Sequence, residues 1–492
     1  MILSELVKAS PNIQQVFGDE HIAVASLSAN SQQKGEKTLF FCISGLRNDG
    51  HMFAEEAVKN GAVALIVERY LPHIACTQVK VKNTRVAMSH IAAAFFGYPH
   101  KKMRLVGITG TKGKTTTSYL LKAILEQTGE LCGLIGTTGN MIGNKKLKST
   151  LTTPDPIELH EILRQMLDEG VKTVVMEVSA HAMDMHRLEG LVFEAGCYTN
   201  LSQDHLDYFG TMEKYFEAKK KFFTTGMVKN VSLNADDDCT DAILKEISAP
   251  NITYGICVPA DLFARNIEIS ETGVEFEVKL HDTQTIDIHI MLPGMFNVYN
   301  ALAAASLAMI LGVDSEVIQK GLASVTVVPG RVEVLDTATP FKLMLDYSHS
   351  PDALSNILST ARSFTQNRVV VLFGCGGDRD QGKRPIMGEV AGRLADLSIL
   401  TSDNPRTEDP MEILAAIELG MKKTEGIYEI IENRREAISR AIDIGQPGDI
   451  IILAGKGHET YQEIMGVKKP FDEKAIVYEL LKEKSLIASE EK

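Results

Sequence analysis

A glycine-rich segment followed by a lysine and threonines carries the clearest chemical signal in the sequence. Residues 109–115 read Thr-Gly-Thr-Lys-Gly-Lys-Thr, after an apolar run and before a helical pattern. Glycines let the backbone wrap around an anion, and the N–H groups at the start of a helix point at it. Lys114 would then reach nucleotide phosphates, and Thr115 or Thr116 would offer a hydroxyl to Mg²⁺. The segment is shorter than the common phosphate loop, so a glycine turn with a stray lysine is the alternative.

Two further polar residues lie where a metal could bind. Glu177 stands near the C-terminal end of the apolar run 171–178. A charge there is costly unless it is paired or metal-bound, and a strand beside a phosphate loop often supplies a Mg²⁺ ligand. A buried salt bridge is the alternative. His205 lies in a loop between two aspartates, where a ligand role and a structural role are both open. Three polar side chains that follow Glu177 could face the same crevice: Ser179, His181 and Arg187.

The last third of the sequence alternates strictly between strands and helices. Strands are predicted at 342–347, 368–374, 396–401, 427–431 and 449–454, and helices at 351–364, 385–395, 410–423, 433–444 and 471–485. This alternation is typical of a parallel, doubly wound sheet, in which ligands bind at the C-terminal ends of the strands. Polar clusters stand at four such ends, and four in series favour a binding site over capping loops: 346–349, 374–380, 402–406 and 455–459.

Three regions of different pattern indicate three α/β domains. Short strands and a helix fill the first region, where Ser31 could bind a ligand or cap a turn. The second region contains the phosphate-loop segment and, at 262–292, a β-rich insertion followed by an apolar helix over 301–311. The third is the alternating region. We expect these domain boundaries: 1–100, 101–330 and 331–492.

Composition argues against several classes of protein. The 492 residues are 44% hydrophobic and 23% charged, which is ordinary globular composition. No apolar stretch reaches the roughly 18 residues that span a bilayer, and the start of the sequence does not read as a signal peptide. A formal net charge of −13 argues against binding to nucleic acid or an anionic membrane. The seven cysteines are scattered without a Cys-x-x-Cys pair, which suits a reducing cytoplasm.

Taken together, these motifs resemble the Mur ligase family over the whole length of the sequence. The resemblance rests on segments that include 109–115, Thr-Thr-Pro (152–154), Glu-Val-Ser-Ala-His (177–181), Thr-Asn-Leu-Ser-Gln-Asp-His-Leu-Asp (199–207), Phe-Asn-Val-Tyr-Asn-Ala (296–301), Asp-Asn-Pro-Arg (403–406) and Gly-Lys-Gly-His-Glu (455–459). It implies a small α/β domain for a UDP-sugar, a central P-loop ATPase-type domain with a β-rich insertion, and a C-terminal Rossmann-like domain. It also implies a monomeric, cytoplasmic amide ligase of peptidoglycan precursor synthesis that uses ATP and Mg²⁺ through an acyl phosphate.

The resemblance assigns roles to single residues. Lys114, Glu177, His205 and Lys219 are implied to be catalytic. ATP is implied at Gly110, Thr111, Lys112, Gly113, Lys114, Thr115, Thr116, Asn300, Arg331, Asp346 and His349. The metal is implied at Thr115, Glu177, His205 and Lys219, the last as a carbamate that turns a cation into a carboxylate-like group. Without the resemblance, the run 219–221 would read as a solvated face. The UDP-MurNAc-dipeptide is implied at Ser31, Thr152, Thr153, Ser179 and Arg187.

The motif at 403–406 resembles the one for meso-diaminopimelate, which differs from lysine by a carboxylate at its far end. Because a guanidinium binds a carboxylate bidentately, Arg379 and Arg406 are candidate clamps, with Glu459 and Asn404 for the distal ammonium. The implied set is Arg379, Asp403, Asn404, Pro405, Arg406, Gly455 and Glu459. Lysine-adding relatives lack the arginine of this motif. A lysine-adding ligase, a folylpolyglutamate-type ligase and an inactive nucleotide-binding regulator are the alternatives, and segment 45–53 favours the Mur branch.

The sequence departs from the family pattern at three places. Asn30, Ser31 and Gln32 stand where Asp-Ser-Arg is usual near the uridine, and Met185 stands where a glutamine is common. Segment 346–352 differs mildly from the usual residues. The first two departures leave a paralogue with an altered acceptor as a further alternative.

Overall fold

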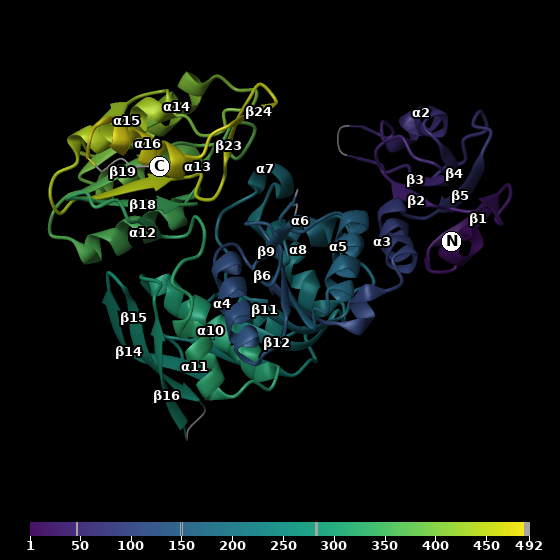
Figure 1. Cartoon of the computed structure of the whole chain (residues 1–492), viewed down its shortest axis with the longest axis horizontal. Helices are drawn as coiled ribbons and strands as arrows, with labels where there is room; N and C mark the ends of the chain where they lie inside the picture. The colour runs from purple at the N-terminus through teal and green to yellow at the C-terminus, as the bar shows by residue number, and fades with distance from the viewer. Residues whose placement is uncertain (46–47, 148, 150, 281–283, 487–492) are drawn as a thin grey trace.

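The protein forms three lobes, each built on its own main β-sheet. The computed structural model describes residues 1–45, 48–147, 149, 151–280 and 284–486. Figure 1 shows the central lobe between the N-terminal and C-terminal lobes. Leu46 and Arg47 of segment 45–53, and residues 281–283 of the predicted β-rich insertion, lie outside the described residues. Among the residues described, no helix is long and apolar enough to cross a membrane.

The N-terminal lobe is a five-stranded sheet in the order β1-β5-β4-β3-β2. Strand β1 runs antiparallel to β5, and the other described strands of this sheet are parallel to their neighbours. Helix α3 begins after Asn83, whose side chain accepts hydrogen bonds from two backbone N–H groups, and its apolar face packs on the sheet. The elements are α1 (Leu3–Val7), β1 (Ile13–Phe17), β2 (Ser26–Ser28), β3 (Thr38–Phe41), η1 (Gly50–Phe53), α2 (Ala54–Lys59), β4 (Ala62–Val67), β5 (Thr77–Val81), α3 (Thr84–Phe95) and η2 (Pro99–Lys102).

The central lobe contains an eleven-stranded sheet in the order β16-β15-β14-β13-β12-β11-β6-β10-β7-β8-β9. The strands from β14 to β7 are parallel, and the two edges are antiparallel, so the predicted β-rich insertion extends the sheet. Its strands are β6 (Arg104–Thr109), β7 (Cys132–Ile135), β8 (Asn140–Ile142), β9 (Lys145–Leu147), β10 (Thr173–Glu177), β11 (Phe193–Tyr198), β12 (Val228–Asn234), β13 (Asn251–Gly255), β14 (Leu262–Ser270), β15 (Gly273–Leu280) and β16 (Gln284–Ile290).

Helices cover both faces of this sheet, which explains the nearly continuous apolar runs in its parallel strands. On β6, Val106 and Ile108 pack in one core with α4, whereas Leu105 packs in the opposite core with α5. The helices are α4 (Lys114–Gln127), α5 (Pro156–Asp168), α6 (Ala180–Asp184), α7 (Leu206–Phe209), α8 (Met212–Thr224), α9 (Thr240–Leu244), α10 (Met295–Ile310) and α11 (Ser315–Ala323). The helix predicted at 301–311 therefore begins six residues earlier, at Met295.

A close approach of α8 to β6 positions the site. A Cβ built on Gly107 would lie 2.4 Å from Cζ of Phe222, so only glycine lets the ring of Phe222 reach the strand. Lys219 lies one helical turn before Phe222, and its Nζ donates a hydrogen bond of 2.7 Å to the carbonyl of Gly110. Core packing thus brings a lysine to the end of β6.

The C-terminal lobe is a doubly wound sheet in the order β17-β18-β22-β19-β20-β21. All five predicted strands and all five predicted helices are present, with ends shifted by a few residues. The antiparallel edge strand β17 and the separate hairpin β23–β24 were not predicted. The elements are β17 (Glu333–Leu335), β18 (Lys342–Asp346), α12 (Pro351–Phe364), β19 (Val369–Phe373), α13 (Lys383–Leu394), β20 (Leu397–Leu400), α14 (Pro410–Met421), β21 (Tyr428–Ile430), α15 (Arg434–Ile444), β22 (Ile450–Ala454), β23 (Tyr461–Ile464), β24 (Val467–Pro470) and α16 (Glu473–Glu483).

Candidate active site

A cavity of about 710 Å³ lies at the junction of the central and C-terminal lobes. It is bounded by the loop after β6, the start of α10, the loop after β18 and one face of α12. It gathers predicted residues from seven segments of the chain: Thr111, Lys112, Gly113, Lys114, Thr115, Thr116, Thr152, Glu177, Ser179, His205, Asn300, Arg331, Asp346 and His349. Its volume suits a nucleotide-sized ligand.

The glycine-rich loop after β6 has the conformation that its sequence predicts. Gly110 and Gly113 have φ of 146° and 86°, which side chains rarely adopt. A Cβ on Gly113 would lie 2.4 Å from Oδ1 of Asn300, so α10 packs directly against the loop. The Nζ of Lys114 donates hydrogen bonds of 2.9 Å to the carbonyls of Gly110 and Thr111. Burial lowers the pKa of Lys114 to about 8, and a bound phosphate would oppose this shift.

Lys219 is buried beneath this loop, so the solvated-face interpretation is wrong for this residue. Its side chain is 1% exposed, and its Nζ lies 4.3 Å from the ring centre of Tyr215. Burial, reinforced by the nearby Lys114 ammonium, holds the pKa of Lys219 well below 10.5. A neutral amine is the form that reacts with carbon dioxide to give a carbamate. The environment of Lys219 therefore fits the modification that the sequence resemblance implies.

Glu177 is a fully buried carboxylate at the end of β10. Its two oxygens accept hydrogen bonds of 2.9 and 3.0 Å from the backbone N–H and the hydroxyl of Thr137. Among the described residues it forms no ion pair with a basic side chain, so the alternative of a buried salt bridge is not what the structure shows. A buried carboxylate without a basic partner fits a site for a divalent cation.

His205 immediately precedes α7 and lines the same cavity as Glu177. Its φ of 56° is in the left-handed region, and its ring meets the ring of His181 at 4.8 Å between centres. Burial lowers the pKa of His205 to about 3, which keeps the imidazole neutral and able to bind a metal. Within the described part of the chain, no three His, Cys, Asp or Glu side chains gather into a metal site. Glu177 and His205 would therefore need Thr115 and a carbamylated Lys219 to complete the ligand set.

Four of the residues predicted for the UDP-linked substrate form one cluster beside Glu177. The hydroxyl of Thr153 donates to the carbonyl of Glu177 at 2.8 Å and to Oγ of Ser179 at 3.1 Å. Arg187 donates to the carbonyl of Thr153 at 2.8 Å, and Thr152 lies 3.1 Å from the hydroxyl of Thr137. Ser31 is apart from them in the N-terminal lobe, where its hydroxyl donates to Glu56 at 2.5 Å.

The residues predicted for the amine substrate gather in the C-terminal lobe. Asn404 donates a hydrogen bond of 2.9 Å to Glu459, and both lie near Asp403 and Gly455 at the ends of β20 and β22. Arg406 has a φ of 53°, and its Nη1 donates to the carbonyl of Gly377 at 2.7 Å. A Cβ built on Gly376 would lie 2.8 Å from Nη1 of Arg406 and 3.7 Å from Cγ of Arg379, so the two guanidinium-bearing chains flank the same glycine. Pro405 stands between Asn404 and Arg406 in the sequence. Its carbonyl would lie 1.9 Å from a Cβ built on Gly377, so this segment packs directly against that glycine.

Polar contacts join the central and C-terminal lobes across the cavity. Arg331 donates to the hydroxyl of Thr115 at 3.2 Å, and Nε2 of His349 lies 3.6 Å from Asp204. Arg379 lies 3.7 Å from Asp207 of the central lobe. Asp346 accepts a hydrogen bond of 2.8 Å from the backbone N–H of Val332 and another from that of Ser348. Its carboxylate thus holds the C-terminal lobe's own loops at the junction.

Several polar groups that build the site were not predicted. Thr137 holds both oxygens of Glu177, but a threonine in a glycine-containing loop gave no signal of this role. Asp204 forms an ion pair of 3.1 Å with the predicted residue Lys112, but the sequence marked this aspartate only as a neighbour of His205. Lys456 lies inside the predicted cluster 455–459 and contacts Glu459 of that cluster and Asp403 of the cluster 402–406, so the two clusters were the available signal.

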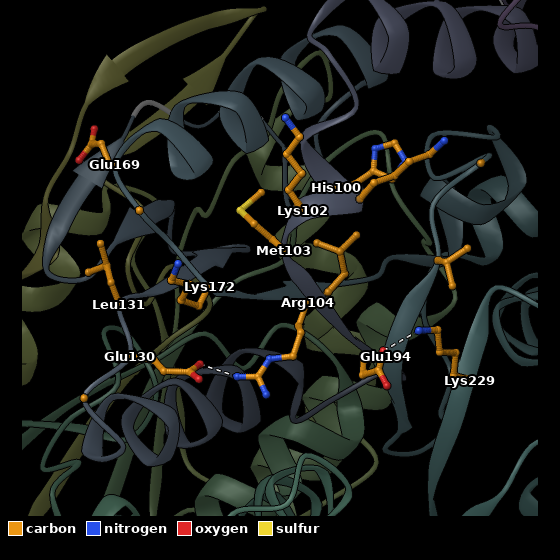
Figure 2. Close-up of a pocket in the computed structure, with 16 residues that line it drawn as sticks. His100, Lys102, Met103, Arg104, Glu130, Leu131, Glu169, Lys172, Glu194 and Lys229 are labelled. Atoms are coloured by element: carbon orange, nitrogen blue, oxygen red, sulfur yellow. Dashed lines mark hydrogen bonds and ion pairs between the residues drawn. The ribbon is translucent and has the colours of Figure 1, made fainter.

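A second, open cavity of about 1050 Å³ lies at the opposite end of the central strands, beside the starts of β6 and β10. Figure 2 shows two ion pairs among its charged side chains, Arg104 with Glu130 and Lys229 with Glu194. It contains none of the predicted site residues. Beta-strand β6 spans about 20 Å, so this cavity is remote from the glycine-rich loop.

Three family profiles match successive parts of the chain. The profile described as "Mur ligase family, catalytic domain" matches residues 23–96, "Mur ligase middle domain" matches 108–308, and "Mur ligase, glutamate ligase domain" matches 330–457. The chain belongs to the Mur ligase family, which confirms both the resemblance and the three-part α/β fold class predicted from the sequence.

Particular members of the family are similar over nearly the whole chain. The UDP-N-acetylmuramoyl-L-alanyl-D-glutamate–2,6-diaminopimelate ligase of Caldanaerobacter subterraneus subsp. tengcongensis is 44% identical over 485 residues, 98% of this chain and 99% of the relative. A ligase of this name from Clostridium acetobutylicum is 43% identical over 95% of this chain and 97% of its own. A solved structure of the same name has 31% identity and a TM-score of 0.68, with 99% of both chains covered. MurF of Thermotoga maritima, solved with ADP, shares the fold at 19% identity and a TM-score of 0.62, over 93% of this chain and 96% of that one.

Proposed function

We propose that this chain is an ATP-dependent ligase that joins meso-diaminopimelate to UDP-MurNAc-L-Ala-D-Glu. The observation that carries the proposal is the arrangement of Lys114, Glu177 and Lys219 around one loop. Arg379 of the C-terminal lobe lies 3.7 Å from Asp207 of the central lobe. Similarity at 44% identity to a relative named as a 2,6-diaminopimelate ligase supports the choice of amine.

We assign the nucleotide to the cavity between the lobes. The loop Gly110–Thr116 would hold the phosphates, and Asn300, Arg331, Asp346 and His349 would border the nucleotide at the domain junction. Thr115, Glu177, His205 and carbamylated Lys219 would hold Mg²⁺, which would offset the charge of the phosphate oxygens. Lys114 supplies a further positive charge to the γ-phosphate once it leaves its own loop carbonyls.

In the proposed reaction, the D-glutamyl carboxylate attacks the γ-phosphate of ATP in line, which releases ADP and forms an acyl phosphate. The amine of diaminopimelate then attacks the acyl carbon. The tetrahedral intermediate loses phosphate, and the amine loses a proton, so that an amide remains. Arg187, Thr153 and Ser179 would hold the peptide end of the UDP-linked substrate beside the phosphate loop. Closure of the lobes places the reacting atoms within about 3–3.5 Å and excludes water that would hydrolyse the acyl phosphate.

Arg379 and Arg406 would bind the distal carboxylate of the amine substrate. In the described part of the chain, Nη1 of Arg406 is taken by a backbone carbonyl, while its Nε lies 3.6 Å from Glu463, a long contact that a carboxylate could replace. Arg379 lies 3.7 Å from Asp207 across the lobe junction, so it is placed to bind a carboxylate of the amine substrate beside the central lobe.

The remaining assignments belong to the same proposal. We place the enzyme in the cytoplasm, because its seven free cysteines suit a reducing compartment. We assign it as a monomer. We keep the domain boundaries at residues 100 and 330, since the first sheet ends at Val81, the second begins at Arg104 and the third begins at Glu333.

Turnover with different amines tests this function. The protein is incubated with ATP, Mg²⁺ and UDP-MurNAc-L-Ala-D-Glu, together with meso-diaminopimelate, L-lysine or no amine, and phosphate and the new amide are measured. We expect both products with diaminopimelate. Turnover with lysine but not with diaminopimelate would refute the role of Arg406. If neither amine gave an amide, the ligase function would be refuted.

A further inference from the structure

A buried lysine sits at the centre of the proposed amine site. Lys456 is fully buried, and its Nζ donates a hydrogen bond of 3.0 Å to Oδ1 of Asn404. The same ammonium lies 3.4 Å from Glu459 and 3.6 Å from Asp403. Gly455 and Gly457, with φ of 114° and 53°, flank the lysine and turn it inward after β22. The reaction as proposed assigns no role to this residue.

The hydrogen bonds of Asn404 leave its amide with one orientation. Its Oδ1 accepts from Nζ of Lys456 and, at 2.9 Å, from the backbone N–H of Glu463. An amide oxygen has two lone pairs, so this atom is fully used. Its Nδ2 donates to Glu459 at 2.9 Å, and its second N–H has no partner among the residues that the structure describes. Asn404 therefore offers a substrate a donor, which suits a carboxylate and not the ammonium to which the sequence assigned it.

We propose that Lys456 is a specificity-determining positioning residue that locks the Asn404 amide as a donor toward the distal carboxylate of the amine substrate. With a neutral apolar residue at position 456, the amide oxygen loses its strongest partner and can turn toward the substrate. An acceptor there repels a carboxylate and favours the bare ammonium end of lysine. The inference rests on the proposed function, because it concerns the choice between two amines in that reaction.

Three substitutions separate this role from a purely structural one. Lys456→Met removes the ammonium and keeps the length of the side chain. Lys456→Gln retains a donor for Oδ1 of Asn404. Asn404→Asp removes the donor at position 404 and leaves Lys456 in the sequence, so it tests the proposal even if Lys456→Met fails to fold.

The readout is kcat/KM for meso-diaminopimelate, together with kcat/KM or the inhibition constant for L-lysine and the KM for ATP. We expect Lys456→Met and Asn404→Asp to lower kcat/KM for diaminopimelate about tenfold or more, the scale of one hydrogen bond to an ion. The KM for ATP should change less than about threefold, the kcat/KM for lysine should not fall, and Lys456→Gln should recover most of the preference for diaminopimelate.

Two results would overturn the inference: an unchanged preference in Asn404→Asp, or equal losses for both amines in a folded Lys456→Met. Wild-type protein that ligates neither amine would instead refute the proposed function, so the two failures are distinguishable.

Discussion

Replacing Arg406 by alanine should weaken the binding of meso-diaminopimelate specifically. The side chain of Arg406 is 21% exposed, and its Nη1 already donates to the carbonyl of Gly377. The rest of the guanidinium, whose Nε makes a long contact of 3.6 Å with Glu463, can make one charge-assisted contact with the substrate, worth about 1.5–3 kcal/mol. This corresponds to an increase of about 10- to 150-fold in KM for diaminopimelate, and partial exposure favours the lower end.

The variant should otherwise remain close to wild type. Arginine and alanine bear the same backbone penalty at a φ of 53°, so the unfolding free energy should fall only by the lost hydrogen bond, about 1 kcal/mol. Steady-state kinetics with each substrate varied in turn would show an ATP KM within about twofold of wild type. Arg393→Ala is the matched control, because Arg393 is 65% exposed on α13 and pairs only with Glu389 among the described residues. An equal rise in the KM values for ATP and diaminopimelate would refute the reasoning.

Three other substitutions test the lysine beneath the phosphate loop, the loop itself and a buried histidine on α5. Lys219→Arg should reduce turnover by about 100-fold or more, since a guanidinium cannot form the carbamate, and a near-normal kcat would contradict that role. Gly113→Ala should raise the KM for ATP and lower the melting temperature, because its Cβ would meet Asn300 at 2.4 Å. His160 is buried, neither of its ring nitrogens has a hydrogen-bond partner within the described part of the chain, and burial lowers its pKa to about 3. As the pH falls, the histidine binds a proton in the unfolded state before it does so in the folded state. The free energy of unfolding therefore decreases below about pH 6.5, by about 2 kcal/mol at pH 5. In urea unfolding, the free energy of unfolding of His160→Phe should depend less on pH than that of the wild type. Parallel pH dependences of the two proteins would contradict this prediction.

The strands, the helices and the phosphate loop could be predicted because local sequence determines them. The run from Leu105 to Ile108 is apolar on both faces, and glycine is required at Gly110 and Gly113. The antiparallel strand β17 was missed because three residues carry no periodic pattern, and hairpin β23–β24 was missed because its turn, Met465–Gly466, is not a common hairpin signal.

The finer arrangement of the site could not be predicted, because it depends on contacts between distant segments. The burial of Lys219 follows from Phe222 packing on Gly107, and the consecutive lysines at 219–221 gave no sign of it. The donor orientation of Asn404 depends on Lys456 and on a hairpin some 60 residues later. Sequence motifs therefore indicated candidate site residues, while packing decides what each side chain presents.

The most direct test of the account follows the oxygen atoms of the reaction. UDP-MurNAc-L-Ala-D-Glu labelled with ¹⁸O in the D-glutamyl carboxylate is incubated with the protein, ATP, Mg²⁺ and meso-diaminopimelate, and the released phosphate is analysed by mass spectrometry. Transfer of one labelled oxygen to each phosphate is expected, since the carboxylate attacks the γ-phosphate. Phosphate without the label, released alongside the amide, would contradict an acyl phosphate formed at the Gly110–Thr116 loop.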